Sequence, residues 1–189
     1  MFKPIKQSIM KSKLTLMAML FAAVLSIYSC SPKVYGLRGN YEVTKNIETS
    51  SSFDDVWNRV IDFFAESNIP IATLEKASGI IVASHVNIEN TLVSIENEQG
   101  EISDKNAWFV FPYEKNLIGG RVECSFNVRV RKQENGKTYI SVNLGGITGY
   151  KSFEFLNALT FRKEIINQTV PSTCYSTGKF EQDLLNLFK

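Results

Sequence analysis

The clearest hydrophobic pattern in the chain lies between residues 53 and 67. Apolar side chains recur there at steps of three and four residues and share one face: Phe53, Val56, Trp57, Val60, Phe63 and Phe64. Ser51 or Ser52 can cap the first turn, and the carboxylates of Asp54 and Asp55 lie at the positive end of the helix dipole. The pattern therefore predicts an amphipathic helix over residues 53–67.

Shorter segments have the alternating or continuous apolar patterns that are typical of β-strands. They cover residues 41–47, 71–75, 80–86, 92–95, 108–111, 121–132 and 138–144. Two turn signals join neighbouring strands: Gly79 supplies a positive φ at the end of residues 76–79, and Asn135-Gly136 is typical of a tight hairpin. The spacing therefore predicts two hairpins, and residues 87–106 are expected to form an exposed excursion around the weak strand.

The C-terminal part has one clear region and one ambiguous region. Ser176-Thr177-Gly178 open a predicted helix with an apolar stripe formed by Phe180, Leu184, Leu187 and Phe188. Residues 151–170 fit either a strand or a short helix, because their apolar positions follow neither period. We interpret Gly145–Gly149 as a strand bend or turn, since the lysine of a phosphate-binding loop is missing. The elements together predict an α+β fold, with an antiparallel sheet packed against two helices, in one domain over residues 41–189.

The first 29 residues have the layout of a secretory signal peptide. Four lysines and no carboxylate accompany an apolar run from Leu14 to Tyr28, and the small residue Ser29 ends the segment. The run is shorter than the roughly 20 residues that a membrane-spanning helix needs. We therefore expect residues 1–29 to be removed from the mature protein.

The leader is followed directly by a cysteine. In Ile27-Tyr28-Ser29-Cys30 an aliphatic residue lies three positions before the cysteine, and a small residue lies immediately before it. This junction resembles the lipobox of bacterial lipoproteins, in particular those of the Bacteroidetes group. The resemblance implies that the thiol of Cys30 carries a diacylglyceryl group and that the leader is cut before it. The alternative is a plain signal peptide with an incidental cysteine.

The resemblance also implies a location. Two or three acyl chains, such as palmitate, anchor a protein stably, since each buried methylene contributes about 0.8 kcal/mol. Residues 30–40, with one proline and two glycines, are then a lipidated tether. Ser31-Pro32-Lys33 lack the acidic cluster that some of these bacteria use for surface export. We therefore expect a cell-envelope protein, anchored to the outer membrane through Cys30 and facing the periplasm.

Composition and charge exclude some partners. The 189 residues are 44% hydrophobic and 21% charged, which is typical of a globular protein, and the formal net charge is +2. Without the leader and its four lysines, 17 basic and 19 acidic residues remain, a net charge of −2. The mature chain thus has no basic excess for nucleic acid, and we expect no nucleic-acid partner.

The sequence offers little for catalysis. Its single histidine, His85, lies in a predicted strand without a local nucleophile or orienting acid, so we interpret it as a half-buried or solvent-facing residue. One histidine is too few for a multi-histidine metal site, and paired-cysteine metal motifs are missing from the sequence. We expect neither enzymatic activity nor a cofactor or metal.

Two further cysteines leave an alternative open. Cys124 and Cys174 would lie in an oxidising compartment, where disulfides persist. They can form a disulfide bridge or remain as two buried thiols, and their spacing does not decide between these states.

Trp108, Phe109, Phe111 and Tyr113 form the one aromatic run with a candidate role in binding. Inside the sheet these residues would be core. On an exposed edge they could receive a partner strand or line a groove, since unpaired backbone groups are ready to form hydrogen bonds.

Three segments carry a second resemblance: residues 53–60, 68–71 and 76–82. They resemble the domains of the C lipoprotein of the bacterial outer-membrane barrel-assembly machinery, in which a helix, a strand, a Ser-Gly turn and a second strand follow in this order within a helix-grip fold. Residues 174–181 are similar to the end of uncharacterised lipoproteins of that general kind. The resemblance covers about 50 residues and implies no enzymatic activity.

The sequence therefore favours a non-catalytic, membrane-anchored lipoprotein that binds envelope protein partners, in outer-membrane assembly or maintenance. The alternative is a periplasmic helix-grip protein that binds a lipid or small molecule. A carrier would need an apolar pocket between sheet and helices, whereas an interaction module would have a filled core and an exposed apolar patch or strand edge.

Overall fold

The computed structural model describes residues 36–189, which belong to one compact α+β unit with mostly antiparallel strands. The predicted signal peptide and Cys30 lie outside the described residues. The described helices are α2 (Phe53–Glu66), α3 (Lys179–Asn186) and the short 3-10 helix η1 (Asn90–Leu92). The strands are β1 (Asn46–Thr49), β2 (Thr73–Glu75), β3 (Ile80–Ile88), β4 (Val93–Ile95), β5 (Phe109–Phe111), β6 (Leu117–Lys132), β7 (Thr138–Leu156), β8 (Lys163–Asn167) and β9 (Tyr175–Ser176).

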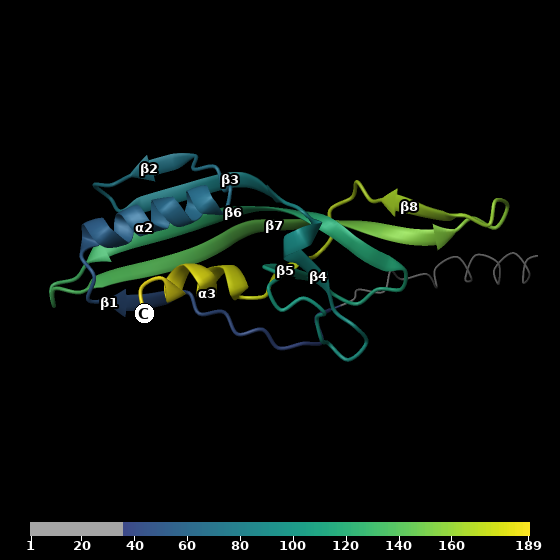
Figure 1. Cartoon of the computed structure of the whole chain (residues 1–189), viewed down its shortest axis with the longest axis horizontal. Coiled ribbons are helices and arrows are strands. Elements are labelled where there is room, and N and C mark those ends of the chain that lie inside the picture. Colours follow the sequence, from purple (N-terminus) through teal and green to yellow (C-terminus); the bar gives the residue numbers. More distant parts are fainter. Residues whose placement is uncertain (1–35) are drawn as a thin grey trace, which may run out of the picture. The chain divides into compact units, whose positions relative to one another are not determined.

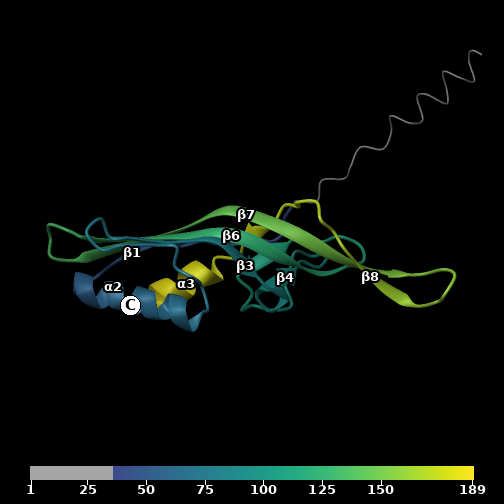
Figure 2. The same ribbon diagram turned by 90° about the horizontal axis from the view of Figure 1, so that it is seen from above.

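The larger sheet is built around two long strands, β6 and β7. Its order is β1-β7-β6-β3-β2, and β8 pairs with the far end of β7. Both α-helices cover the same face of this sheet (Figure 2). They lie over one half of β6 and β7, and the β7–β8 hairpin lies at the other end (Figure 1). The predicted antiparallel sheet with two helices is therefore confirmed.

A second, smaller sheet has the order β4-β5-β9, and in it β4 pairs with β5 in parallel. The sequence analysis did not predict this second sheet or its parallel pair. The chain leaves the end of β4 at Ile95 and returns to its start, where Phe109 lies opposite Val93. β5 therefore runs in the same direction as β4.

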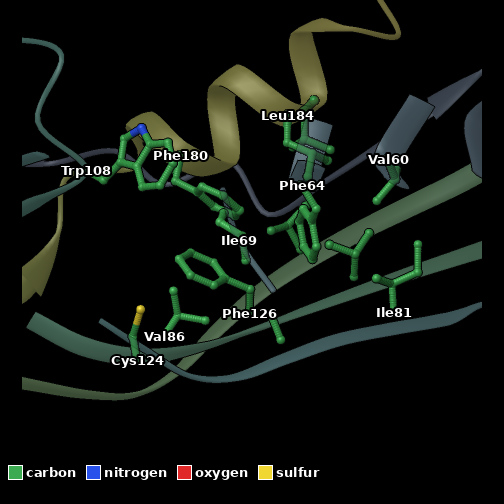
Figure 3. Close-up of a cluster of buried hydrophobic side chains, with 14 of the residues drawn as sticks. Val60, Phe64, Ile69, Ile81, Val86, Trp108, Cys124, Phe126, Phe180 and Leu184 are labelled. Atoms are coloured by element: carbon green, nitrogen blue, oxygen red, sulfur yellow. The ribbon is translucent and has the colours of Figure 1, made fainter. Parts of the chain in front are cut away.

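Aromatic side chains fill the space between the helices and the larger sheet. Phe180 of α3 lies against Phe126 of β6, with ring centroids 4.2 Å apart, and against Trp108, at 5.0 Å. Phe64 of α2 contacts both phenylalanines at 6.3 Å. Figure 3 shows these rings pointing toward one another from the helices and the sheet. They form the centre of the core, and Phe64, Phe126 and Phe180 are fully buried.

Two bulges face β6 from opposite sides. On β3, Ser84 and His85 lie opposite the single residue Ser125, and on β7, Gly146 and Ile147 lie opposite Cys124. Each bulge inserts one extra residue and increases the local bend of the strand. Gly146 has a φ of 61°, in the region that favours glycine. The interpretation of Gly145–Gly149 as a bend is confirmed, although the strand continues through it.

The predicted element ends were correct at α2 and less accurate elsewhere. Ser52 caps α2 by accepting a hydrogen bond from the Asp55 amide at 3.1 Å. The strand expected at 41–47 begins only at Asn46, and before it the Tyr41 hydroxyl donates a hydrogen bond to Glu96. In α3, Leu187 is exposed, and Leu185 takes its place in the buried stripe.

Candidate functional site

The aromatic run that was a candidate binding surface lies in the core. Phe109 and Phe111 are fully buried and Trp108 is 7% exposed, so these three residues cannot form an exposed surface. Phe111 lies so close to Gly120 and Gly149 that a Cβ atom at either glycine would overlap its ring. Tyr113 is half-buried and donates a hydrogen bond to Glu98 at 2.9 Å. The prediction of a binding site on Trp108, Phe109 and Phe111 was therefore wrong, and the core alternative is confirmed.

Cys124 and Cys174 are free thiols, and both are buried. Burial raises the pKa of each thiol to about 12. The charge of Cys174 adds to the rise at Cys124, whereas hydrogen bonds with the backbone of Tyr175 and Val110 oppose the rise at Cys174. Of the two alternatives, the structure contains the buried thiols, which are protonated at neutral pH.

His85 faces solvent, with 86% of its side chain exposed, as the sequence suggested. It lies at the β3 bulge with a φ of 53°, and its Nδ1 atom is 2.9 Å from Oε1 of Glu123. Within residues 36–189, three or more histidine, cysteine or acidic side chains do not gather into a possible metal site. The helices of this range are also too short or too polar to cross a membrane.

The most exposed apolar side chains of the described region lie on and beside the β7–β8 hairpin. Ten large hydrophobic residues are exposed in residues 36–189, and seven of them lie between Phe155 and Val170. Leu159 and Phe161 in the turn are 93% and 81% exposed. Contiguous exposed apolar surface marks an interaction site in a soluble domain. We therefore take the hairpin as the candidate functional site.

Both faces of the hairpin carry apolar side chains. Adjacent residues of a strand point to opposite faces, so Phe155 and Leu156 of β7 lie on different faces, as do Ile165 and Ile166 of β8. Phe155 stacks on Phe153 near the base of the hairpin, at a centroid distance of 6.1 Å. One face is mainly apolar, with Phe153, Phe155 and Ile166, whereas the other combines Leu156 and Ile165 with the ion pair of Glu154 and Lys163.

Asn157 organises the turn between β7 and β8. Its side-chain oxygen accepts hydrogen bonds from the amides of Leu159, at 2.9 Å, and Thr160, at 3.2 Å. Its backbone carbonyl accepts a hydrogen bond from the Phe161 backbone amide at 2.8 Å. Its backbone amide donates a hydrogen bond to the Arg162 carbonyl, also at 2.8 Å. Phe161 has a φ of 53°, which is unusual for a side chain of this size. These bonds hold Leu159 and Phe161 in a defined, outward position.

The N-terminal segment of the described region is held by a buried carboxylate. Glu96 is 1% exposed and accepts hydrogen bonds from the backbone amides of Arg38, at 3.0 Å, and Gly39, at 2.8 Å, and from the Tyr41 hydroxyl, at 3.0 Å. The predicted tether therefore becomes part of the domain from Arg38 onward. Burial and the contact with Glu96 raise the pKa of Tyr41 above its ordinary value, so this phenol stays protonated and donates.

Residues 113–117 connect this segment to the base of the hairpin. The Arg38 guanidinium lies over the Tyr113 ring, 5.4 Å from its centroid. Three residues later, the Asn116 carbonyl accepts a hydrogen bond from the Glu154 amide at 2.9 Å. Glu114 forms an ion pair with Lys151 at 2.6 Å. The chain that leads from Cys30 thus enters the domain beside the hairpin.

Comparisons of the chain with protein families, curated proteins and solved structures found no match. The site is therefore defined by its own geometry. Sequence analysis missed Leu159 and Phe161 as functional residues. The available signal was that residues 151–170 are rich in apolar side chains that follow neither a helical nor a strand period. Such a pattern fits a hairpin that carries some apolar side chains on each face.

Proposed function

We propose that this protein is a non-catalytic, membrane-anchored lipoprotein of the cell envelope that acts through its β7–β8 hairpin. The observation that carries the proposal is the apolar hairpin on a domain whose core is filled. A role in outer-membrane assembly or maintenance, with envelope partners, follows from the resemblance of residues 53–82 to barrel-assembly lipoprotein domains. Phe53 of α2 lies beside Gly79 in the turn between β2 and β3, which is compatible with the helix-grip arrangement that this resemblance implies.

The alternative, a carrier of a lipid or small molecule, has less support. Aromatic rings occupy the space between α2, α3 and the sheet, where a carrier needs a cavity (Figure 3). Surface hollows lie elsewhere, including one of about 430 Å³ beside Tyr41 and Lys105 and one of about 470 Å³ beside Arg131 and Glu134. Both are bordered by charged and polar groups, which does not suit an apolar ligand.

Cell fractionation with three variants tests the proposal. The wild-type chain should be in the membrane fraction with an acylated Cys30, and Cys30→Ala should be released. Leu159→Ser combined with Phe161→Asn should stay in the membrane but lose the envelope components that cross-link to the wild type. Asparagine is chosen at position 161 because it tolerates the positive φ found there.

Leu74→Ser is the matched control, since Leu74 is an exposed leucine on β2, at 51%. Its cross-links should equal those of the wild type. An unacylated Cys30, or cross-links that the double hairpin variant leaves unchanged, would contradict the proposal.

A further inference from the structure

The hairpin combines an apolar tip with a turn in which three backbone amides form internal hydrogen bonds. The amides of Leu159, Thr160 and Phe161 all donate to Asn157. Lipid chains offer no hydrogen-bond partner, so internal bonds to these three amides lower the cost of moving the turn from water to the membrane surface. We infer that the tip inserts among the lipids of the bilayer in which Cys30 is anchored. This inference rests on the proposed function, because it requires the lipid anchor.

Exposure increases along the hairpin toward the tip. Phe155 on β7 is 42% exposed, whereas Leu159 in the turn is 93% exposed. A groove on a protein would cover mainly one face of the hairpin, but apolar side chains occupy both faces and are most exposed at the end. End-on entry into a bilayer surrounds all of them at once. This distribution favours a lipid surface over a protein groove or a second copy of the chain.

The formal charges on the hairpin cancel, and two of them form an ion pair. Glu154 and Lys163 form an ion pair at 2.9 Å, and the Asn157 amide group donates to Glu164 at 2.6 Å. Residues 154–167 contain two positive side chains, Arg162 and Lys163, and two negative ones, Glu154 and Glu164. Attraction to the bilayer therefore comes from apolar contact. It should not require anionic lipids and should change little with salt.

The anchor is long enough for the tip to reach the membrane. The eight residue steps from Cys30 to Arg38 span at most about 26–29 Å. The five residues of β8 extend about 17 Å. Because Arg38 lies over Tyr113, and the nearby Asn116 holds Glu154, the anchor and the hairpin start from neighbouring points. The acyl chains and the tip can thus enter one bilayer while Arg38 stays docked.

Lipid-borne quenchers test the insertion in the acylated full-length chain. Leu159→Trp and the control Leu74→Trp are reconstituted in vesicles of phosphatidylethanolamine and phosphatidylglycerol that contain brominated phosphatidylcholine. The native Trp57 and Trp108 are buried and supply the same background in both variants. We expect bromine to quench the tryptophan at 159 and shift its emission to the blue, equally at low and high salt. The tryptophan at 74 should remain accessible to acrylamide in water.

The outcomes separate the inference from the proposed function. If intact mass and vesicle flotation show an anchored Cys30 but the tryptophan at 159 is as open to acrylamide as that at 74, insertion is overturned while the anchor stands. In Leu159→Trp/Phe161→Asn, the bromine quenching of the tryptophan at 159 should be several-fold weaker than in Leu159→Trp alone. Such a decrease would support insertion, since each apolar side chain contributes roughly tenfold to partitioning. Protection of position 159 that requires a second protein, without bromine quenching, would also overturn it. Unchanged thermal unfolding of the variants is the control for folding.

Discussion

Glu181 places a carboxyl group inside the interface between α3 and the sheet. The residue is 2% exposed, and the Ser176 hydroxyl donates to both carboxylate oxygens at 3.2 and 3.1 Å. Burial raises the pKa of Glu181, against the opposing effects of its backbone and Ser176 hydrogen bonds and the charge of Lys45. The folded state therefore binds this proton more tightly than the unfolded state. The stability from this group is fully present below the unfolded pKa and is lost as pH rises through the folded pKa.

Glu181→Gln should become more stable relative to the wild type as pH rises. Glutamine keeps an acceptor for Ser176 but has no charge to bury, so the gain in unfolding free energy should grow as the pH rises above the ordinary carboxyl pKa of about 4. Urea unfolding at several pH values measures it. Glu66→Gln, at an exposed position on α2, is the control and should show no such trend. A gain that is constant or shrinks with pH would argue against the burial effect.

Cys124 and Cys174 should resist alkylation in the folded protein. With each pKa at about 12, only about one thiol in 10⁴ is ionised at pH 8, and both are buried. Iodoacetamide should label them only after unfolding, whereas an exposed control such as Leu159→Cys should react at once. Mass spectrometry gives the number of alkylated thiols per chain. A mass two hydrogens lower than that of the dithiol would show a disulfide instead.

Among the elements, the docked N-terminal segment depends on one side chain. Glu96→Ala removes the acceptor of the Arg38 and Gly39 amides and the Tyr41 hydroxyl. Trypsin should then cleave after Arg38 at least about tenfold faster, because losing a charged acceptor costs more than about 1.4 kcal/mol of local stability. Glu101→Ala in the same loop, where the carboxylate contacts only Asn97, is the control. Equal cleavage rates in the two variants would show that Glu96 does not hold the segment.

Elements with local signals could be predicted from the sequence. α2 has its own cap at Ser52 and one apolar face, so its limits follow from nearby residues. Long-range pairing could not be predicted in the same way. The glycines at 145–149 indicate an interruption, yet β7 continues because β6 supplies hydrogen bonds on both sides of the bulge. The parallel pair β4–β5 depends on where a long loop returns, which no local pattern determines.

The candidate site was the hardest element to predict. The aromatic residues of Trp108–Tyr113 made this segment a candidate, but aromatic residues are common in cores. Here Trp108 packs against Phe180 of α3, and Phe109 and Phe111 are fully buried. The exposed hairpin around Leu159 was left ambiguous because a strand with apolar residues on both faces lacks the usual alternation. Interaction surfaces can thus violate the patterns that identify ordinary surface strands.

At the scale of the whole described unit, the packed core and the candidate interaction site lie on different parts of β6 and β7. One half carries the helices and the aromatic core, and the other half carries the hairpin and the point where the N-terminal segment docks (Figures 1 and 2). This separation means that the hairpin tip can change without loss of core packing. The docked residue Arg38 lies over Tyr113, in the same loop as Asn116, which holds the base of the hairpin.

The most direct test of this account is photo-cross-linking in living cells from a reactive side chain at position 159, compared with position 74. Both positions hold exposed leucines, on the hairpin and on β2. The account predicts adducts with membrane components from position 159 and only background from position 74. Equal labelling from the two positions, or no adduct from position 159, would contradict the claim that the hairpin is the interaction site.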